Sequence, residues 1–153
     1  MNKLLHHLYS SGETRRYHNR PKLNQTTGQH MWGVATIIIA LHPNPSANLL
    51  KAALLHDSPE KVYGDLLSPL KVDFPEAKAL DEKCALKFWE DTEKEYGFLY
   101  PNLTEDEKLW LDYADVYECC LFALSEEHEE IYIYSLTKSR KIAEELIKLG
   151  YDL

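Results

Sequence analysis

The chain has 153 residues, the size of one domain that can bury a hydrophobic core. Its net charge of -8, from 25 acidic and 17 basic residues, argues against a protein that binds a nucleic acid polymer by neutralising many phosphates. A single charged small molecule could still be bound locally.

Cysteine usage and hydropathy narrow the class further. The three cysteines have no CxxC spacing, so they indicate neither a disulfide framework nor a zinc knuckle. No apolar run reaches the roughly 18 residues that a membrane span requires. We therefore expect one soluble, cytoplasmic domain over residues 1–153, without a membrane partner.

The first part of the chain predicts two helices joined by an arm. Leucines at helical spacing predict a short helix over residues 2–9, which Ser10-Ser11-Gly12 ends. Residues 13–25 have no apolar period and are the one locally basic segment, so they predict an ordered arm, although a solvated loop is the alternative. Thr26 and Gln29 have capping-box spacing and predict a helix that ends at Pro43. Its residues from 32 to 41 are apolar nearly all round, which is typical of a central helix.

The next segment predicts a helix, a break and a restart. Ser46 is the expected N-cap of a helix whose apolar period continues to His56 and Asp57. Ser58 before Pro59 predicts a second N-cap and a short helix that contains Glu60 and is closed by Gly64-Asp65. Residues 66–73 predict a linking turn with room for a short helical piece.

Three signals place the remaining helices. Residues 75–96 predict a long amphipathic helix ended by Gly97. Thr104 and Glu107 form a second capping-box pattern, which predicts a helix to about Leu124. A last helix is expected over 131–149. The helix after Thr104 should bury Leu109, Trp110, Tyr113, Ala114, Tyr117 and Leu121. No segment has the period of a strand, so the predicted class is all-α, with about six to seven helices.

Four residues that can ligate a metal emerge from these apolar helices. His30 opens one helix, His56 and Asp57 end the next, and Asp115 lies on the expected buried face of a third. An unpaired buried carboxylate would cost several kcal/mol, and a cation would remove that cost. A histidine at a helix start is more often a capping residue, and Asp115 could pair with Arg or Lys. The four residues together favour a divalent metal.

The spacing of these residues resembles the H…HD…D signature of HD-domain metal-dependent phosphohydrolases. His56 follows His30 by 26 residues (56 − 30), and Asp115 follows Asp57 by 58 (115 − 57). Residues 54–69 are similar to the HDxxE…GDxxxP pattern of 5′-deoxynucleotidases, although Gln29 stands where those enzymes often have Glu. Residues 12–21, Gly-Glu-Thr-Arg-Arg-Tyr-His-Asn-Arg-Pro, resemble the small phage dATP triphosphohydrolases that serve 2-aminoadenine genomes.

The resemblance implies a helical HD-domain bundle with one divalent ion, which would be Zn, Co, Mn or Mg. The implied ligands are His30, His56, Asp57 and Asp115. Glu60 would orient or deprotonate the attacking water, and Asp65 would help to position that water or a second ion at the phosphates. Arg15 or Arg16 would grip phosphate, Tyr17 would stack on the base, and the other substrate-binding residues would be His18 and Lys71.

The leading hypothesis is a dATP triphosphohydrolase, which would release deoxyadenosine and triphosphate or remove phosphates stepwise. The first alternative is a 5′-deoxynucleotidase that acts on monophosphates. An alternative of another class is a nucleotide-binding regulatory module in which the metal is structural. The expected partners are a deoxynucleotide substrate and further copies of the chain, since the resemblance implies a homo-oligomer, a dimer or larger.

Overall fold

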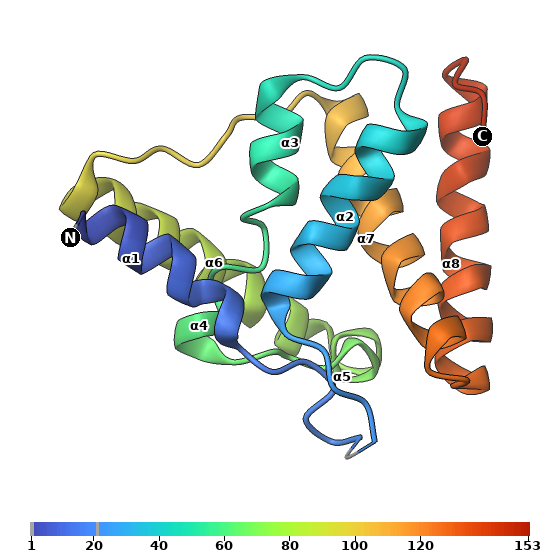
Figure 1. The fold of residues 1–153 in the computed structure, drawn as a ribbon, viewed down its shortest axis with the longest axis horizontal. Coiled ribbons are helices and arrows are strands. Elements are labelled where there is room, and N and C mark those ends of the chain that lie inside the picture. Colours follow the sequence, from blue (N-terminus) through green and yellow to red (C-terminus); the bar gives the residue numbers. More distant parts are fainter. Residues whose placement is uncertain (1, 21) are drawn as a thin grey trace. The chain divides into compact units, whose positions relative to one another are not determined.

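The computed structural model describes residues 2–20 and 22–153, in which 3₁₀ and α-helices are joined by loops, as Figure 1 shows. An isolated antiparallel bridge joins Arg15 to Thr26, and the described residues contain no named strand. The predicted all-α class is confirmed. The described part has eight α-helices, more than predicted, because Ser68–Asp73, within the segment predicted as a linking turn, forms a short helix of its own. Met1 and Pro21, the latter in the predicted arm, lie outside the described residues.

The chain divides into two compact units, each made of two stretches of sequence. The first contains the described residues up to Gln29 together with Leu55–Tyr100. The second contains His30–Leu54 and Pro101–Leu153. The expectation of a single domain over residues 1–153 stays a prediction.

The first unit consists mostly of short helices and the long helix α6. Its elements are α1 (Lys3–Tyr9), the 3₁₀ helix η1 (Ser10–Glu13), α4 (Glu60–Tyr63), α5 (Ser68–Asp73) and α6 (Pro75–Tyr96). Helix α5 packs on α6, and α4 contacts both η1 and α6. Gly97, with φ of 67°, ends α6 in the left-handed conformation as predicted. Leu80, expected on the packed face of α6, is exposed, whereas Phe88 and Thr92 are buried.

Buried polar contacts join separate segments of this unit. The Thr27 hydroxyl donates to the Ser11 carbonyl at 2.7 Å, and the Ser11 and Ser58 hydroxyls are hydrogen-bonded at 2.9 Å. The prediction of Ser58 as an N-cap is therefore wrong, because α4 begins after Pro59 without a side-chain cap. Gly12 and Gly28 pass so closely that a Cβ on Gly28 would lie 3.0 Å from the Gly12 carbonyl oxygen.

Hydrogen bonds join the described residues at the two ends of the predicted arm. The Arg16 N–H donates to the Gln25 carbonyl, and the Thr27 N–H donates to the Thr14 carbonyl, both at 2.9 Å. Thr26 and Gln29 exchange the two hydrogen bonds of a capping box. The arm therefore leads directly into the first turn of α2.

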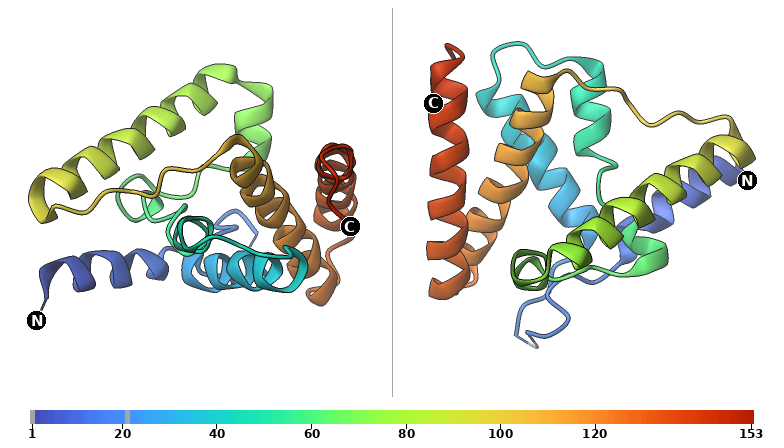
Figure 2. Two further views of the ribbon diagram at one scale, coloured as in Figure 1. Left: turned by 90° about the horizontal axis from the view of Figure 1, so that it is seen from above. Right: turned by 180° about the vertical axis from the view of Figure 1, so that it is seen from behind.

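The second unit contains the hydrophobic core. Helix α2 (Thr27–Leu41) begins in the first unit and continues here, with α3 (Ala47–Ala53), α7 (Glu105–Ser125) and α8 (Glu129–Lys148). Helices α7 and α8 lie side by side (Figures 1 and 2). Predicted caps at Ser46 and Thr104 are confirmed. The buried core residues are Val34, Ala35, Ile37, Ile38, Leu49, Ala53, Trp110, Tyr113, Ala114 and Leu146.

Several local expectations for this unit are wrong. Helix α3 ends at Ala53, short of the predicted end at His56 and Asp57. Helix α2 is not buried all round, because Trp32 is 67% exposed and Ile39 is also exposed. Leu121 on α7 is exposed too, since α7 turns only one side toward the core.

Candidate functional site

His56 and Asp57 lie in a turn of the first unit that leads into α4. The Ser58 N–H donates to the Leu55 carbonyl at 2.9 Å, and the Glu60 N–H donates to the Asp57 carbonyl at 3.0 Å. This turn places His56 Nε2 3.5 Å from Asp57 Oδ1, with both side chains largely buried. An imidazole nitrogen and a carboxylate oxygen at this separation can bind the same divalent ion.

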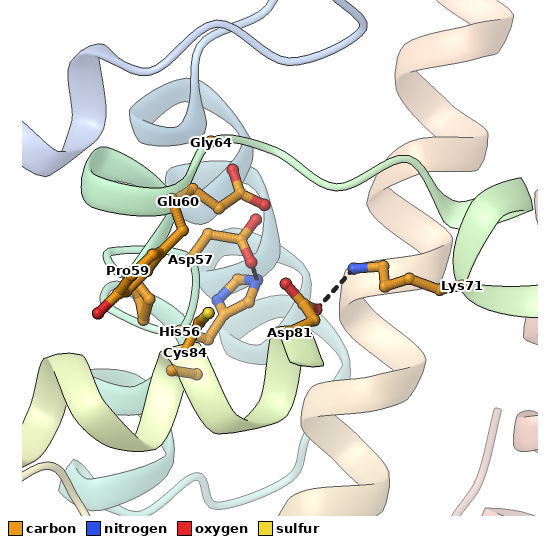
Figure 3. A pocket seen from close by; sticks show the side chains of 10 residues that line it. His56, Asp57, Pro59, Glu60, Gly64, Lys71, Asp81 and Cys84 are labelled. Carbon is orange, nitrogen blue, oxygen red and sulfur yellow. Dashed lines mark hydrogen bonds and ion pairs between the residues drawn. The ribbon is translucent and has the colours of Figure 1, made fainter. Parts of the chain in front are cut away.

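A cavity of about 70 Å³ opens beside this pair. Figure 3 shows Glu60 and Asp57 on one side of it and the Lys71 and Asp81 pair on the other. A water molecule needs roughly 10–15 Å³ of such space, so the cavity holds several waters or one phosphate group. Its lining residues are His56, Asp57, Pro59, Glu60, Tyr63, Gly64, Lys71, Asp81, Cys84 and Ala85.

Glu60 is a carboxyl group with a strongly raised pKa that lines this cavity. Its burial, followed by the negative charge of Asp57, raises its pKa to about 9, although Arg16 acts in the opposite direction. Its buried Oε2 has no hydrogen-bonding partner within the described part of the chain. A strongly shifted carboxyl group in a cavity is typical of an acid or base in a functional site.

Lys71 carries a positive charge to the same cavity. Its Nζ donates to Asp81 Oδ2 at 3.0 Å. Burial alone would lower the pKa of Lys71, but the hydrogen bond and charge of Asp81, with Asp57 and Glu60, raise it above its ordinary value. Asp81 was not predicted as a site residue, because it lies on a helix with many charged residues and matches no motif.

The arm contributes Arg16 to the site. Arg16 Nη1 pairs with Asp57 Oδ2, and its side chain is only 12% exposed. Arg15 is exposed and donates instead to the Leu23 carbonyl at 3.3 Å. Tyr17, whose φ is 52°, donates its N–H to Asp65 Oδ2 at 3.3 Å. His18 is exposed and is not among the residues that line the cavity.

The second unit places His30 against two carboxylates of α7. His30 is fully buried, and its Nε2 lies 2.9 Å from Asp115 Oδ1. Asp115 was expected on a buried face, but its side chain is 40% exposed. The buried acid is Glu118, which pairs with His30 Nδ1 and escaped the sequence reasoning. Its position one helical turn after Asp115 was the available signal.

Each unit by itself therefore contains an imidazole beside a carboxylate. In an octahedral site, ligand atoms about 2.1 Å from the ion lie about 3 Å apart, close to the separation of His30 Nε2 and Asp115 Oδ1. In the second unit, His30, Glu118 and Cys119 also offer ligand atoms within 4.8 Å of one another. These donor types fit a divalent transition metal.

Comparison with protein families decides the class. A family model of the HD domain matches residues 13–148. The chain belongs to the HD-domain family. HD domains are generally metal-dependent hydrolases, so the general resemblance seen in the sequence is confirmed. The HD match includes the arm, both His–carboxylate pairs and all of α8.

Two further searches gave negative results. A search among curated proteins gave no match. None of the helices in residues 2–20 and 22–153 combines the length and apolar character that crossing a membrane requires.

Proposed function

We propose that this HD domain is a metal-dependent hydrolase of deoxynucleotides, and that its substrate is dATP. The observation that carries the proposal is Glu60, a buried carboxyl group beside Asp57 in a cavity that also contains Lys71. A structural metal site requires ligands only, whereas a carboxyl group with a perturbed pKa supplies acid–base chemistry.

The family resemblance supports one ligand set, in which His30, His56, Asp57 and Asp115 would bind the ion. When bound, the ion would acidify a water molecule and offset the negative charge of the phosphate oxygens. This assignment is an inference from the family and from the geometry of each pair.

Glu60 would exchange protons during hydrolysis. The charge of the bound ion would lower the pKa of Glu60, so that its carboxylate can take a proton from the attacking water, whose oxygen forms a bond to the α-phosphorus. The bond from that phosphorus to the 5′ oxygen breaks, and the proton returns to this oxygen. Deoxyadenosine and triphosphate leave. Asp65, which accepts a hydrogen bond from the Tyr17 N–H, would help to position the water or a second ion.

The arm and α5 would bind the substrate. Arg16 is the better candidate for the phosphate because it already lies beside Asp57, whereas Arg15 is directed to a backbone carbonyl. Its guanidinium can bind two phosphate oxygens at once. Lys71 would contact a phosphate in the cavity, Tyr17 would stack on the base, and His18 would contact the substrate from the arm.

The second candidate is a 5′-deoxynucleotidase that acts on monophosphates, which the likeness of residues 54–69 to the HDxxE…GDxxxP pattern supports. A homo-oligomer stays a prediction that light scattering can test.

The experiment is incubation of the purified protein with a panel of dNTPs and dNMPs plus Mn²⁺, Co²⁺ or Zn²⁺. Triphosphate and deoxyadenosine released from dATP are the expected products. Release from monophosphates alone would replace the triphosphohydrolase with the nucleotidase, and no release from any nucleotide would end the hydrolase proposal.

A Glu60→Ala variant separates the enzyme from a regulatory module with a structural metal. The enzyme should retain the metal and lose turnover by roughly 10²–10⁴-fold. A structural site should show equal nucleotide binding in the variant and the parent, with no turnover in either.

A further inference from the structure

Both ring nitrogens of His30 face carboxylates from one helix. Asp115 lies 2.9 Å from Nε2, and Glu118 pairs with Nδ1. The two acids are three residues apart on α7, so one helical face presents both carboxylates to the imidazole. All three residues belong to the second unit.

The Glu118 side chain lies deep in this unit and is only 10% exposed. A carboxylate at that depth is costly unless a donor satisfies it. Because a carboxylate only accepts hydrogen bonds, its partner Nδ1 must carry the proton. Nε2 faces the Asp115 carboxylate, and a metal ion bound by both would take the Nε2 lone pair in place of a proton.

Gly33 provides the space that this contact requires. A Cβ at Gly33 would lie 2.7 Å from Cγ and 3.0 Å from Oε1 of Glu118. Gly33 follows His30 by one turn on α2, so Glu118 reaches the imidazole across the surface that a side chain would otherwise cover. Glycine is therefore required here for the close approach and not for a backbone angle.

We propose that Glu118 is a positioning residue for His30, and that glycine at position 33 leaves the space that the Glu118 side chain occupies. Glu118 holds the imidazole as the Nδ1–H tautomer and turns Nε2 toward the metal. Carboxylates that act in this way fix ring orientation and strengthen the ligand. The expected effect of Glu118 on metal binding rests on the proposed function, whereas the position of the proton on the His30 ring does not.

The tautomer is tested first, on the metal-free protein. Long-range ¹H–¹⁵N NMR at pH 8 should show His30 with its proton on Nδ1. Glu118→Ala should shift the His30 signals toward a mixture of tautomers, and Glu126→Gln, an exposed change at the end of the same helix, should leave them unchanged. A His30 ring whose only proton lies on Nε2 in the parent protein would overturn the proposal.

Metal affinity is tested next by titration with Zn²⁺ or Mn²⁺. Glu118→Gln keeps the size of the side chain and should weaken binding by roughly 10–100-fold, as should Gly33→Ala, which displaces Glu118 from a different helix. Circular dichroism shows whether each variant folds. Affinities within twofold of the parent in both folded variants would contradict the positioning role.

Two other outcomes can be distinguished from a loss of the positioning contact. If Cys119→Ser weakens binding as strongly as Glu118→Gln, Glu118 and Cys119 are themselves ligands with His30, and the positioning role is overturned. If the parent protein binds none of the metals, the proposed function fails, and the NMR result alone decides the tautomer part.

Discussion

The two units have interiors of different chemistry. The second unit buries aliphatic and aromatic side chains from α2, α3, α7 and α8 around Trp110. In the first unit, the described residues bury few large apolar side chains, Leu23 and Phe88 among them, and several polar ones. The buried polar residues of the first unit are Ser11, Gln25, Thr27, Ser58 and Thr92.

Because of this difference, apolar packing contributes mainly to the stability of the second unit, and hydrogen bonds mainly fix the positions of side chains in the first. Apolar packing is not directional, and burial of a large side chain contributes about 1.5–3 kcal/mol. A buried hydrogen bond contributes only about 0.5–1.5 kcal/mol net, but it fixes distance and direction. The second unit adds the directed contact of His30 with Glu118 to its apolar core, whereas the cavity with Glu60 lies in the unit whose interior has few large apolar side chains. There a carboxyl group has been buried at a cost to stability.

The largest expected effect is the pH dependence that Glu60 confers on the metal-free protein. In the unfolded chain Glu60 ionises near 4.5, whereas in the folded protein its pKa is about 9. The folded state binds the extra proton between these values, so its stability falls as pH rises through that window, by up to about 1.4 kcal/mol per pH unit.

Glu60→Gln removes this titration. Chemical denaturation in the presence of a chelator should show that the variant gains stability relative to the parent from pH 5 to pH 9. A constant difference between the two proteins over this range would show that Glu60 is not a costly buried carboxyl group.

Trp110→Ala should destabilise the protein by about 3–5 kcal/mol, because it leaves a cavity in the core of the second unit. Thermal unfolding followed by circular dichroism measures the loss. Trp32→Ala, an exposed tryptophan in the same unit, is the matched control and should change stability by less than about 1 kcal/mol. Equal effects would contradict the assigned core.

Arg16→Lys should raise KM for the nucleotide by roughly tenfold, about 1.4 kcal/mol, because lysine cannot bind two phosphate oxygens in one plane. Steady-state kinetics measure the change. Arg15→Lys alters a neighbouring arginine that contacts a carbonyl, and it should change KM little. A larger effect at Arg15 would reverse the assignment within the arm.

Ser58→Ala should have the smallest effect, about 1 kcal/mol, through loss of the hydrogen bond to Ser11. Denaturant unfolding tests it against Ser125→Ala, where the lost hydroxyl is exposed and bonds only within its own helix. If Ser58→Ala is as mild as Ser125→Ala, directed contacts do not stabilise the first unit.

Local signals explain what could be predicted from the sequence. Capping boxes at Thr26 and Thr104 and the terminator Gly97 depend on residues only a few positions apart, so these helix ends were predicted correctly. The Ser58 cap failed because its hydroxyl has a partner 47 residues earlier in the chain, and no local pattern encodes such a contact.

By itself, the sequence determined the all-α class, most helix boundaries and the HD spacing, because helical period and motif spacing are properties of neighbouring residues. Only the tertiary structure decided that Arg16 rather than Arg15 meets Asp57, and that Glu118 rather than Asp115 is the buried acid on His30. These contacts join residues 41 and 88 positions apart, and which of two adjacent or helically related side chains makes them depends on how whole helices pack.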